Sequence, residues 1–185
     1  AYSSIANIGY AILGIAAGTE AGLQAMIVFM TLYMIDTMGF FAILLSLSRN
    51  GRPIRTIADL AGLKNDRPVT AIAITVLSLS VLGMPPLSGF WGKYYVFGAA
   101  ASAGYWLAAA AGLVASVVAA FYYLRIIKLM WFDAAPEGLA KTDKAPVESQ
   151  WIGWACAAFA FPLVIVGLTW LEPATRIAAS GFGAG

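Results

Sequence analysis

One lysine stands alone in the long apolar middle of the chain, and its amine could hold and release a proton. Lys93 is the only charged residue between Val69 and Leu124. Placing a lysine in the hydrocarbon of a bilayer costs roughly 2.5–3.5 kcal/mol on insertion scales. A membrane lysine can extend to the interface instead, but apolar and small residues follow Lys93 as far as the turn near Ser102. The position therefore favours a functional amine, whose charge its surroundings can switch.

A proline pair precedes this lysine in the segment Met84-Pro85-Pro86-Leu87-Ser88-Gly89. Proline removes a backbone donor and interrupts a helix, which leaves neighbouring backbone groups available inside a membrane. We expect a helix break formed by Pro85, Pro86 and Gly89. A discontinuous helix beside a buried amine is typical of ion-translocating membrane proteins.

An acidic residue lies near the middle of the preceding apolar run. Tyr33, Asp36 and Thr37 are spaced i, i+3, i+4 and share one helix face. Lys93 is the only other charge at comparable depth, so it is the predicted partner of the Asp36 carboxylate. Two interpretations stay open: Asp36 transfers protons, or it orients helices as an ion pair or as a protonated, hydrogen-bonded carboxyl.

Hydroxyl and amide groups could extend a proton pathway from these two side chains. The candidate path of water and hydroxyl groups comprises Ser3, Asn7, Tyr10, Tyr33, Ser78 and Ser88. Ser3, Asn7 and Tyr10 are spaced i, i+4, i+7 on one face of the first apolar run. For these three residues, ordinary hydrogen bonding between helices is the favoured alternative.

Composition places these residues in a membrane. The 185 residues are 61% apolar and 11% charged, with a mean hydropathy of +0.82, whereas a soluble domain carries about 25% charged residues. The net charge of +2 gives no sign of nucleic-acid binding. We predict an all-α integral membrane protein, a polytopic helix bundle forming one membrane domain over 1–185. The predicted spans are 1–17, 21–48, 69–101 (broken at 83–88), 104–132 and 150–171.

The third predicted span is too long for one uninterrupted crossing. Its 33 residues would reach roughly 50 Å as a helix, against about 30 Å of hydrocarbon. One broken crossing puts the basic residues of loops 49–67 and 133–149 on the same side of the membrane, whereas two crossings would separate them. The positive-inside tendency favours one crossing, with both loops cytoplasmic and the C-terminus outside.

Two further patterns concern packing. Gly104, Ala108, Gly112, Ser116 and Ala120 recur every fourth residue, which predicts close approach of a neighbouring helix. In the first basic loop, the apolar spacing over 54–63 fits a short interfacial helix, and an ordinary solvated loop fits equally well.

The sequence offers few ligands for redox groups. It has no histidine and a single cysteine, Cys156, inside an apolar run. The usual ligands of haem, copper and iron–sulfur clusters are therefore absent from this sequence, and we expect no metal and no electron carrier on this chain. The chain has no initiator methionine and no signal-peptide pattern, so we expect it to be the C-terminal part of a longer protein.

Several motifs in sequence order resemble one family. They are 1–10, 59–63, 83–90, Gly92-Lys93 and 121–128. Together they resemble the C-terminal part of subunit N, in the antiporter-like subunit family of proton-translocating NADH:quinone oxidoreductase (respiratory complex I).

The resemblance implies a fold and a role. Family members have fourteen spans in two inverted five-helix repeats, so the five spans here would be the second repeat. Lys93 occupies the position of the family's distal lysine after the helix break, and upstream family residues, a glutamate and two lysines, would lie outside this chain. Asp36 departs from the family pattern, because related members often carry His or Lys in this helix.

The implied function is proton translocation coupled to electron transfer elsewhere in the complex. The chain would be a non-redox subunit of an enzyme in a bacterial plasma (inner) membrane. NADH, FMN, iron–sulfur clusters and quinone would lie on other subunits, and its partners would be other membrane-arm subunits, including antiporter-like ones, and the lipid bilayer. The alternatives are a cation/proton antiporter subunit and a structural scaffold; the row of small residues suits the scaffold, and Lys93 does not.

Overall fold

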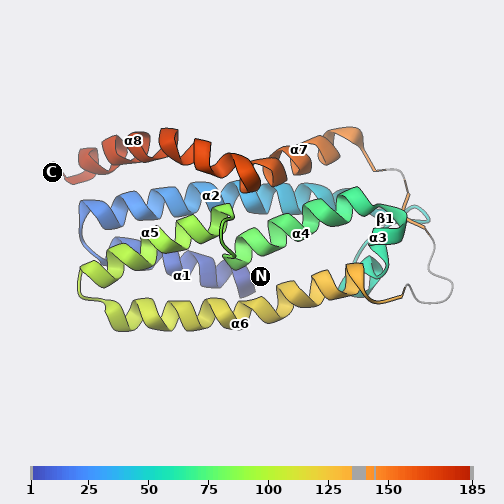
Figure 1. Ribbon diagram of the computed structural model, residues 1–185, viewed down its shortest axis with the longest axis horizontal. Coiled ribbons are helices and arrows are strands. Elements are labelled where there is room, and N and C mark those ends of the chain that lie inside the picture. The colour runs from blue at the N-terminus through green and yellow to red at the C-terminus, as the bar shows by residue number, and fades with distance from the viewer. Residues whose placement is uncertain (1, 135–140, 144, 184–185) are drawn as a thin grey trace.

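A bundle of helices along one long axis forms the molecule (Figure 1). The computed structural model describes residues 2–134, 141–143 and 145–183. The helices are α1 (Tyr2–Ala16), α2 (Glu20–Ser46), α3 (Leu63–Asp66), α4 (Pro68–Leu82), α5 (Ser88–Ser102), α6 (Trp106–Trp131), α7 (Val147–Ala158) and α8 (Val164–Gly183). Two two-residue strands, β1 (Ser48–Arg49) and β2 (Arg52–Pro53), and a one-turn 3₁₀ helix at Ile57–Leu60 complete the elements.

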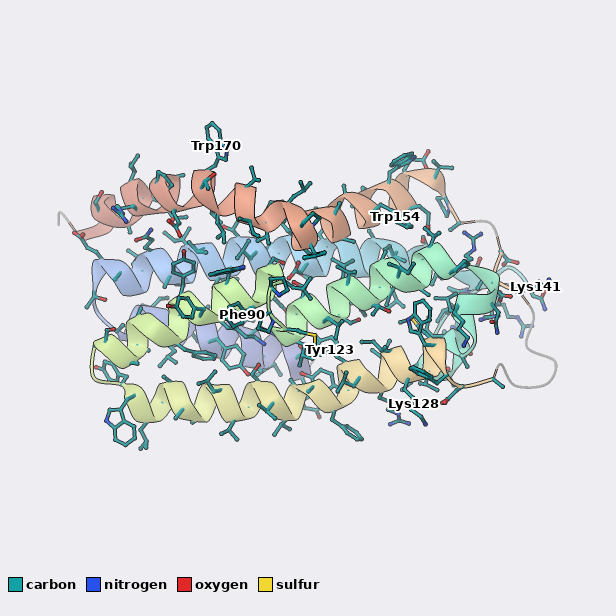
Figure 2. The ribbon with its side chains drawn as sticks, viewed as in Figure 1. Phe90, Tyr123, Lys128, Lys141, Trp154 and Trp170 are labelled. Atoms are coloured by element: carbon teal, nitrogen blue, oxygen red, sulfur yellow. The ribbon has the colours of Figure 1, made fainter. Side chains whose placement is uncertain are left out.

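The predicted broken third span is two helices in succession. α4 and α5 have 15 residues each and follow one another along the bundle axis, with the break halfway (Figure 1). Each half would reach about 22 Å, so only the pair matches the thickness of a bilayer core. The two basic loops consequently lie at the same end of the bundle, where Figure 2 shows Lys128 and Lys141.

The C-terminal part of the chain is more helical than we predicted. The last predicted span, 150–171, is part of a pair of helices, α7 and α8, that begins at Val147 and ends at Gly183. A kink at Phe159–Leu163 separates the pair, because Pro162 interrupts the helix and Phe161 is extended (φ −161°, ψ 126°). The segment after Glu172 lies beyond the predicted span and continues α8 as far as Gly183, and its alanines have the highest intrinsic helix propensity.

Within the described residues, three helical segments are long and apolar enough to cross a membrane. They are Glu20–Ser46, Trp106–Trp131 and the combined Val147–Gly181, while α1 and α4 are shorter apolar helices. Much of the outward surface is apolar: Leu107, Val117 and Phe121 on α6 are exposed, and Trp170 projects away from α8 (Figure 2). Such a surface fits lipid or partner helices rather than water.

Two of the three apolar cores found in the described residues lie on either side of the helix break. One joins α2, α4 and α7 around Ile43, Ile74 and Ala157, towards the basic end. The other joins α1, α2 and α5 around Phe29 and Val96. The break therefore sits between two packed regions, with α2 running past it as a continuous support.

The first basic loop is folded, and of the two alternatives left open for 54–63 the structure has a loop with one turn of 3₁₀ helix. The 3₁₀ turn at Ile57–Leu60 ends before Gly62, which adopts φ +67° and starts α3. Gly62 N–H donates to the Leu129 carbonyl of α6, which holds the turn against that helix. The small hairpin β1–β2 was not predicted, because two-residue strands leave no periodic pattern.

Arg49 anchors this loop from inside. Its guanidinium donates to Asp66 at 3.1 Å and to the carbonyls of Asp59 (3.0 Å) and Ala61 (3.4 Å). The Asp59 carboxylate in turn accepts from the backbone N–H groups of Thr56 and Arg55, and these hydrogen bonds hold its pKa below the usual range.

The two basic loops are also joined to each other. Arg49 pairs with Thr142 in an isolated β-bridge, and Gly51 N–H donates to the Asp143 carboxylate at 2.8 Å. The Arg67 side chain donates to the Asp143 carbonyl. Residues 135–140 and Lys144 of the second basic loop lie outside the described residues.

Candidate proton-transfer site

The helix break is built by local rules at the end of α4. Gly83 adopts φ +97°, a left-handed conformation that ends helices, and its N–H donates to the carbonyls of Leu79 and Ser80. Met84 N–H donates to Leu79 as well. Pro85 and Pro86 have no N–H to offer to the last turn of α4. The carbonyls of Val81 and Leu82 are thereby left for another donor.

Lys93 is that donor. Its ammonium donates to the carbonyls of Val81 (3.0 Å) and Leu82 (2.7 Å) and to the Ser116 hydroxyl (2.7 Å). An ammonium has three hydrogens, so these three acceptors satisfy it completely. Lys93 is only 7% exposed. The structure therefore contains the predicted buried amine beside a broken helix.

The positive charge of the Lys93 ammonium is stabilised by the dipoles of its neutral neighbours. The two carbonyls end α4, where the helix dipole is negative. The Tyr10 ring lies 5.6 Å from Lys93 Nζ, close enough for a cation–π contact. Gly83 allows this approach, because a Cβ there would lie 3.2 Å from the same nitrogen. A groove of about 840 Å³, mostly apolar, lies between α5 and α6 and is lined by Lys93 and Ser116.

Asp36 does not pair with Lys93, so the predicted ion pair is wrong. Its carboxylate is fully buried and contacts two hydroxyls: Ser80 at 2.6 Å from Oδ2 and Ser88 at 2.8 Å from Oδ1. Ser80 and Ser88 also contact each other at 2.6 Å, and Gly89 N–H donates to Ser80 Oγ at 3.0 Å. Asp36 and Lys93 do not pair because each side chain has its own hydrogen-bond partners at the break.

Asp36 and Lys93 thus make separate sets of contacts at the break. Asp36 contacts a serine from each half of the broken helix, whereas Lys93 binds the carbonyls at the end of α4 and a hydroxyl of α6. Gly89, expected in the break, lies in the first turn of α5 instead. A Cβ there would lie 1.9 Å from the Ser80 carbonyl oxygen, so only glycine lets α5 start this close to α4.

The polar face of α1 lies beside Lys93. Asn7 and Tyr10 are buried, and Ser3 contacts the Tyr123 hydroxyl of α6 at 2.6 Å. Asn7 Nδ2 donates to the Ser3 carbonyl at 2.8 Å. Asn7 Oδ1 and the Tyr10 hydroxyl have no hydrogen-bond partner among the described residues. Buried polar atoms of this kind are usually satisfied by water.

A cavity with several hydroxyl groups in its lining lies at the other end of this face. It has a volume of about 340 Å³ and is lined by Ser3, Tyr33, Thr37, Tyr123 and other residues of α1, α2, α4 and α6. Figure 2 shows Tyr123 on the inner side of α6. Tyr33 belongs to this cavity, whereas Ser78 lies elsewhere: its hydroxyl is buried without a hydrogen-bond partner in the described part of the chain.

Two important site residues, Ser116 and Tyr123, are not among the predicted path residues. Ser116 belongs to the row of small residues on α6, and in the structure it is the third acceptor of Lys93. Its signal was available, because it is the one hydroxyl in that row. The row packs only in part: Gly112 faces Phe97 of α5, while Gly104 and Ala108 are exposed. Tyr123 gave no periodic signal among the neighbouring aromatic residues.

No cluster of three or more His, Cys, Asp or Glu side chains that could hold a metal occurs within residues 2–134, 141–143 and 145–183. The site is therefore best described by its hydrogen bonds and buried charges. A buried amine, a buried carboxyl and a row of hydroxyls around a helix break suit proton movement.

A family model described as NADH:quinone oxidoreductase/Mrp antiporter, TM, matches residues 1–119. The chain belongs to this family. The matched region contains α1, α2, α4, α5, Asp36, Lys93 and Ser116.

Curated relatives confirm the resemblance to subunit N. NADH-quinone oxidoreductase subunit N of Caulobacter sp. (strain K31) is 60% identical over 99% of this chain and 38% of its own length. The subunit of the same name from Methylobacterium nodulans is 43% identical over 100% of this chain and 36% of its own length. The chain thus spans a little over a third of the relatives that it matches.

Solved structures agree on the fold. A chain of respiratory complex I from Thermus thermophilus with bound aureothin has a TM-score of 0.75 at 33% identity, covering 92% of this chain and 38% of that one. A chain of the Mrp complex from Dietzia sp. DQ12-45-1b has a TM-score of 0.78 at 24% identity, covering 97% and 41%. The second shares the fold.

Proposed function

We propose that this chain is part of the antiporter-like membrane-arm subunit of a respiratory NADH:quinone oxidoreductase and that Lys93 carries protons through it. The observation that carries the proposal is the bonding of the Lys93 amine: it is buried, and all three acceptors are neutral groups. A permanent structural cation inside a protein is usually paired with a carboxylate. An amine held by neutral dipoles can lose its proton without leaving a buried carboxylate uncompensated.

The driving force is electrostatic. Electron transfer elsewhere in the enzyme would change the charge of neighbouring groups, which alters the free energy of the Lys93 ammonium. Moving one charge against 100 mV costs about 2.3 kcal/mol. The loss of one hydrogen bond to a charged group is of the same size, about 1.5–3 kcal/mol. A small movement of α6 or of the end of α4 could therefore release the proton.

One face of α1 supplies a pathway from the amine. The unpartnered Tyr10 hydroxyl and Asn7 Oδ1 lie along α1 between Lys93 and the Ser3–Tyr123 contact, and both residues of that contact line the cavity. Water bound to those two atoms would connect Lys93 to the cavity. Asp36 is a second proton-transfer group that contacts Ser88, and Tyr33 belongs to the lining of the cavity.

We also propose the arrangement in the membrane. The chain would cross the bilayer five times, with α4 and α5 as one crossing, and would form the second of two inverted repeats. The loops with Arg49 and Lys141 would face the cytoplasm of a bacterium and the C-terminus the outside. The exposed apolar faces would contact lipid and other membrane-arm subunits, and redox cofactors would lie on those other subunits.

The test replaces Lys93 by Met in the full-length subunit within the intact complex. Protons pumped per NADH oxidised are measured in sealed membrane vesicles, and a lower ratio is expected. Lys128→Met is the matched control, because the Lys128 side chain is 69% exposed at the end of α6. An unchanged ratio for Lys93→Met in an assembled complex would remove this residue from the pathway.

A second candidate is a subunit of a cation/proton antiporter, because the matched family includes Mrp antiporters as well as NADH:quinone oxidoreductase and the Mrp chain shares the fold. Sodium transport in vesicles without NADH separates the two functions. Sodium efflux that depends on Lys93 but not on NADH would support the antiporter.

A further inference from the structure

The contacts around Asp36 form a closed ring of oxygen atoms. Asp36 Oδ2 contacts Ser80 Oγ at 2.6 Å, Ser80 Oγ contacts Ser88 Oγ at 2.6 Å, and Ser88 Oγ contacts Asp36 Oδ1 at 2.8 Å. All three residues have no exposed surface. Each distance is in the range of an O–H···O hydrogen bond, so each contact requires one hydrogen between its two oxygens.

A count of hydrogens shows what the ring needs. Each serine hydroxyl contributes one hydrogen, so an ionised Asp36 leaves the ring with two hydrogens for three contacts. Two oxygens 2.6 Å apart with no hydrogen between them would repel. The remaining neighbour, Gly89 N–H, donates to Ser80 Oγ from outside the ring and does not fill the gap. A proton on the carboxyl supplies the third hydrogen.

We infer that Asp36, Ser80 and Ser88 form a proton-holding ring, in which Asp36 is a neutral carboxylic acid and the ring binds one exchangeable proton. Its surroundings agree. No cation lies within 4 Å of this carboxyl among the described residues, where the ion pairs found are Arg49–Asp66 and Lys128–Asp133. A buried, unpaired carboxylate is costly, and protonation removes the charge. The titratable groups that interact with Asp36 from α7 and α6 are the Cys156 thiol and the Tyr123 phenol, which carry no positive charge.

The ring can also pass a proton from one side of the carboxyl to the other. In one arrangement Asp36 Oδ2 donates to Ser80, Ser80 to Ser88, and Ser88 to Asp36 Oδ1. In the reverse arrangement all three hydrogens move one place: three O–H bonds break, three form, and the net charge is unchanged. Ser80 Oγ accepts one ring hydrogen and the Gly89 N–H in both, so both arrangements satisfy every group.

The ring joins three elements at the break. Asp36 comes from α2, Ser80 from α4, and Ser88 and Gly89 from α5. Loss of the proton would leave one contact repulsive and would favour separation of α4 from α5. Ser80 is the residue before Val81, whose carbonyl binds Lys93. This role in translocation rests on the proposed function; the presence of the proton on Asp36 does not.

The test is infrared difference spectroscopy on the purified complex with the full-length subunit. At neutral pH we expect a C=O band of a protonated carboxyl, sensitive to D₂O, that is absent from Asp36→Asn. Ser80→Ala and Ser88→Ala should shift this band, because each removes a hydrogen bond to the carboxyl. Ser78→Ala is the matched control on the same helix, also buried but outside the ring, and should leave it unchanged.

The outcomes separate the ring from the function. A spectrum of Asp36→Asn without a lost carboxyl band would show that Asp36 is ionised and would overturn the ring. If Asp36→Asn does not assemble, a band unmoved in both serine variants would overturn it. A normal pumping ratio for Asp36→Asn, with a lowered ratio for Lys93→Met, would remove the ring from translocation. A carboxyl band present while Lys93→Met pumps normally would instead refute the proposed function alone.

Discussion

Gly89→Ala tests whether the close start of α5 against α4 is required for assembly. A Cβ at this position would lie 1.9 Å from the Ser80 carbonyl oxygen and 2.7 Å from its carbonyl carbon, whereas ordinary contact begins at 3.4 Å. Both obstructing atoms belong to the backbone, so no side-chain rotation relieves the clash. The start of α5 must therefore move away from α4 by more than 1 Å.

The expected cost follows from what this movement breaks. The hydrogen bond from Gly89 N–H to Ser80 Oγ (3.0 Å) and the Ser80–Ser88 contact (2.6 Å) would be lost. Each contributes about 0.5–1.5 kcal/mol, and overpacking of a tight site costs about 1–3 kcal/mol. A destabilisation of about 3 kcal/mol is expected, which is a large part of the stability of a domain.

The assay heats detergent-solubilised membranes that contain the full complex and measures the fraction that stays assembled. Gly98→Ala is the matched control, since it lies on the same helix with nothing within 4 Å of the added Cβ. It should be neutral or stabilising by up to about 1 kcal/mol, because alanine favours helix. Equal heat resistance of the two variants would refute the reasoning about the break.

Three further predictions concern Lys93 and the basic end. Ser116→Ala removes one of the three acceptors of the Lys93 ammonium, a hydrogen bond worth about 1.5–3 kcal/mol, so the proton-to-NADH ratio should fall. Val118→Ala, on the exposed side of α6, should leave the ratio unchanged, and equal ratios for the two variants would contradict the role of Ser116. Arg49→Met removes the cation that pairs with the Asp66 carboxylate and should destabilise the fold by about 3 kcal/mol, seen as a lower assembled fraction. The exposed Arg52→Met should not lower it, and the reverse order would be inconsistent with the buried anchor. Asp59 has a lowered pKa in the folded loop, so its stabilising effect is present above the unfolded value of about 3.9 and is lost as the pH falls through the folded pKa. The protection factor of the Thr56 amide, which is its exchange rate in the unfolded chain divided by that in the folded loop, should therefore fall only below about pH 4, and a fall near neutral pH would contradict the assignment.

Much of the site could be predicted because its signals are local. A proline pair, a lone lysine and a lone aspartate inside apolar runs are each visible within a few residues, and the break and both buried groups are present. The charge pattern also placed the two basic loops at one end, which the Arg49–Thr142 bridge bears out.

The partners of these groups could not be predicted, because they depend on the distance between helices. Ser116 is 23 residues from Lys93 and Ser80 is 44 from Asp36. The expected ion pair relied on depth alone, and depth does not show which hydrogen-bond partners each group meets at the break. The hairpin at Ser48–Pro53 and the helix after Glu172 were missed for another reason: short strands and Gly-containing helices have weak patterns.

The positions of these partners along the chain set an order for biogenesis. Synthesis proceeds from the N-terminus, so α2 is already present when α4 and α5 emerge from the ribosome, and the carboxyl of Asp36 can meet both serines at once. Ser116 is translated later, on α6. Until that helix inserts, the amine of Lys93 has only two of its final acceptors. A nascent chain halted before α6 would therefore have a finished carboxyl ring and an incomplete lysine site, so docking of α6 is the step that completes it.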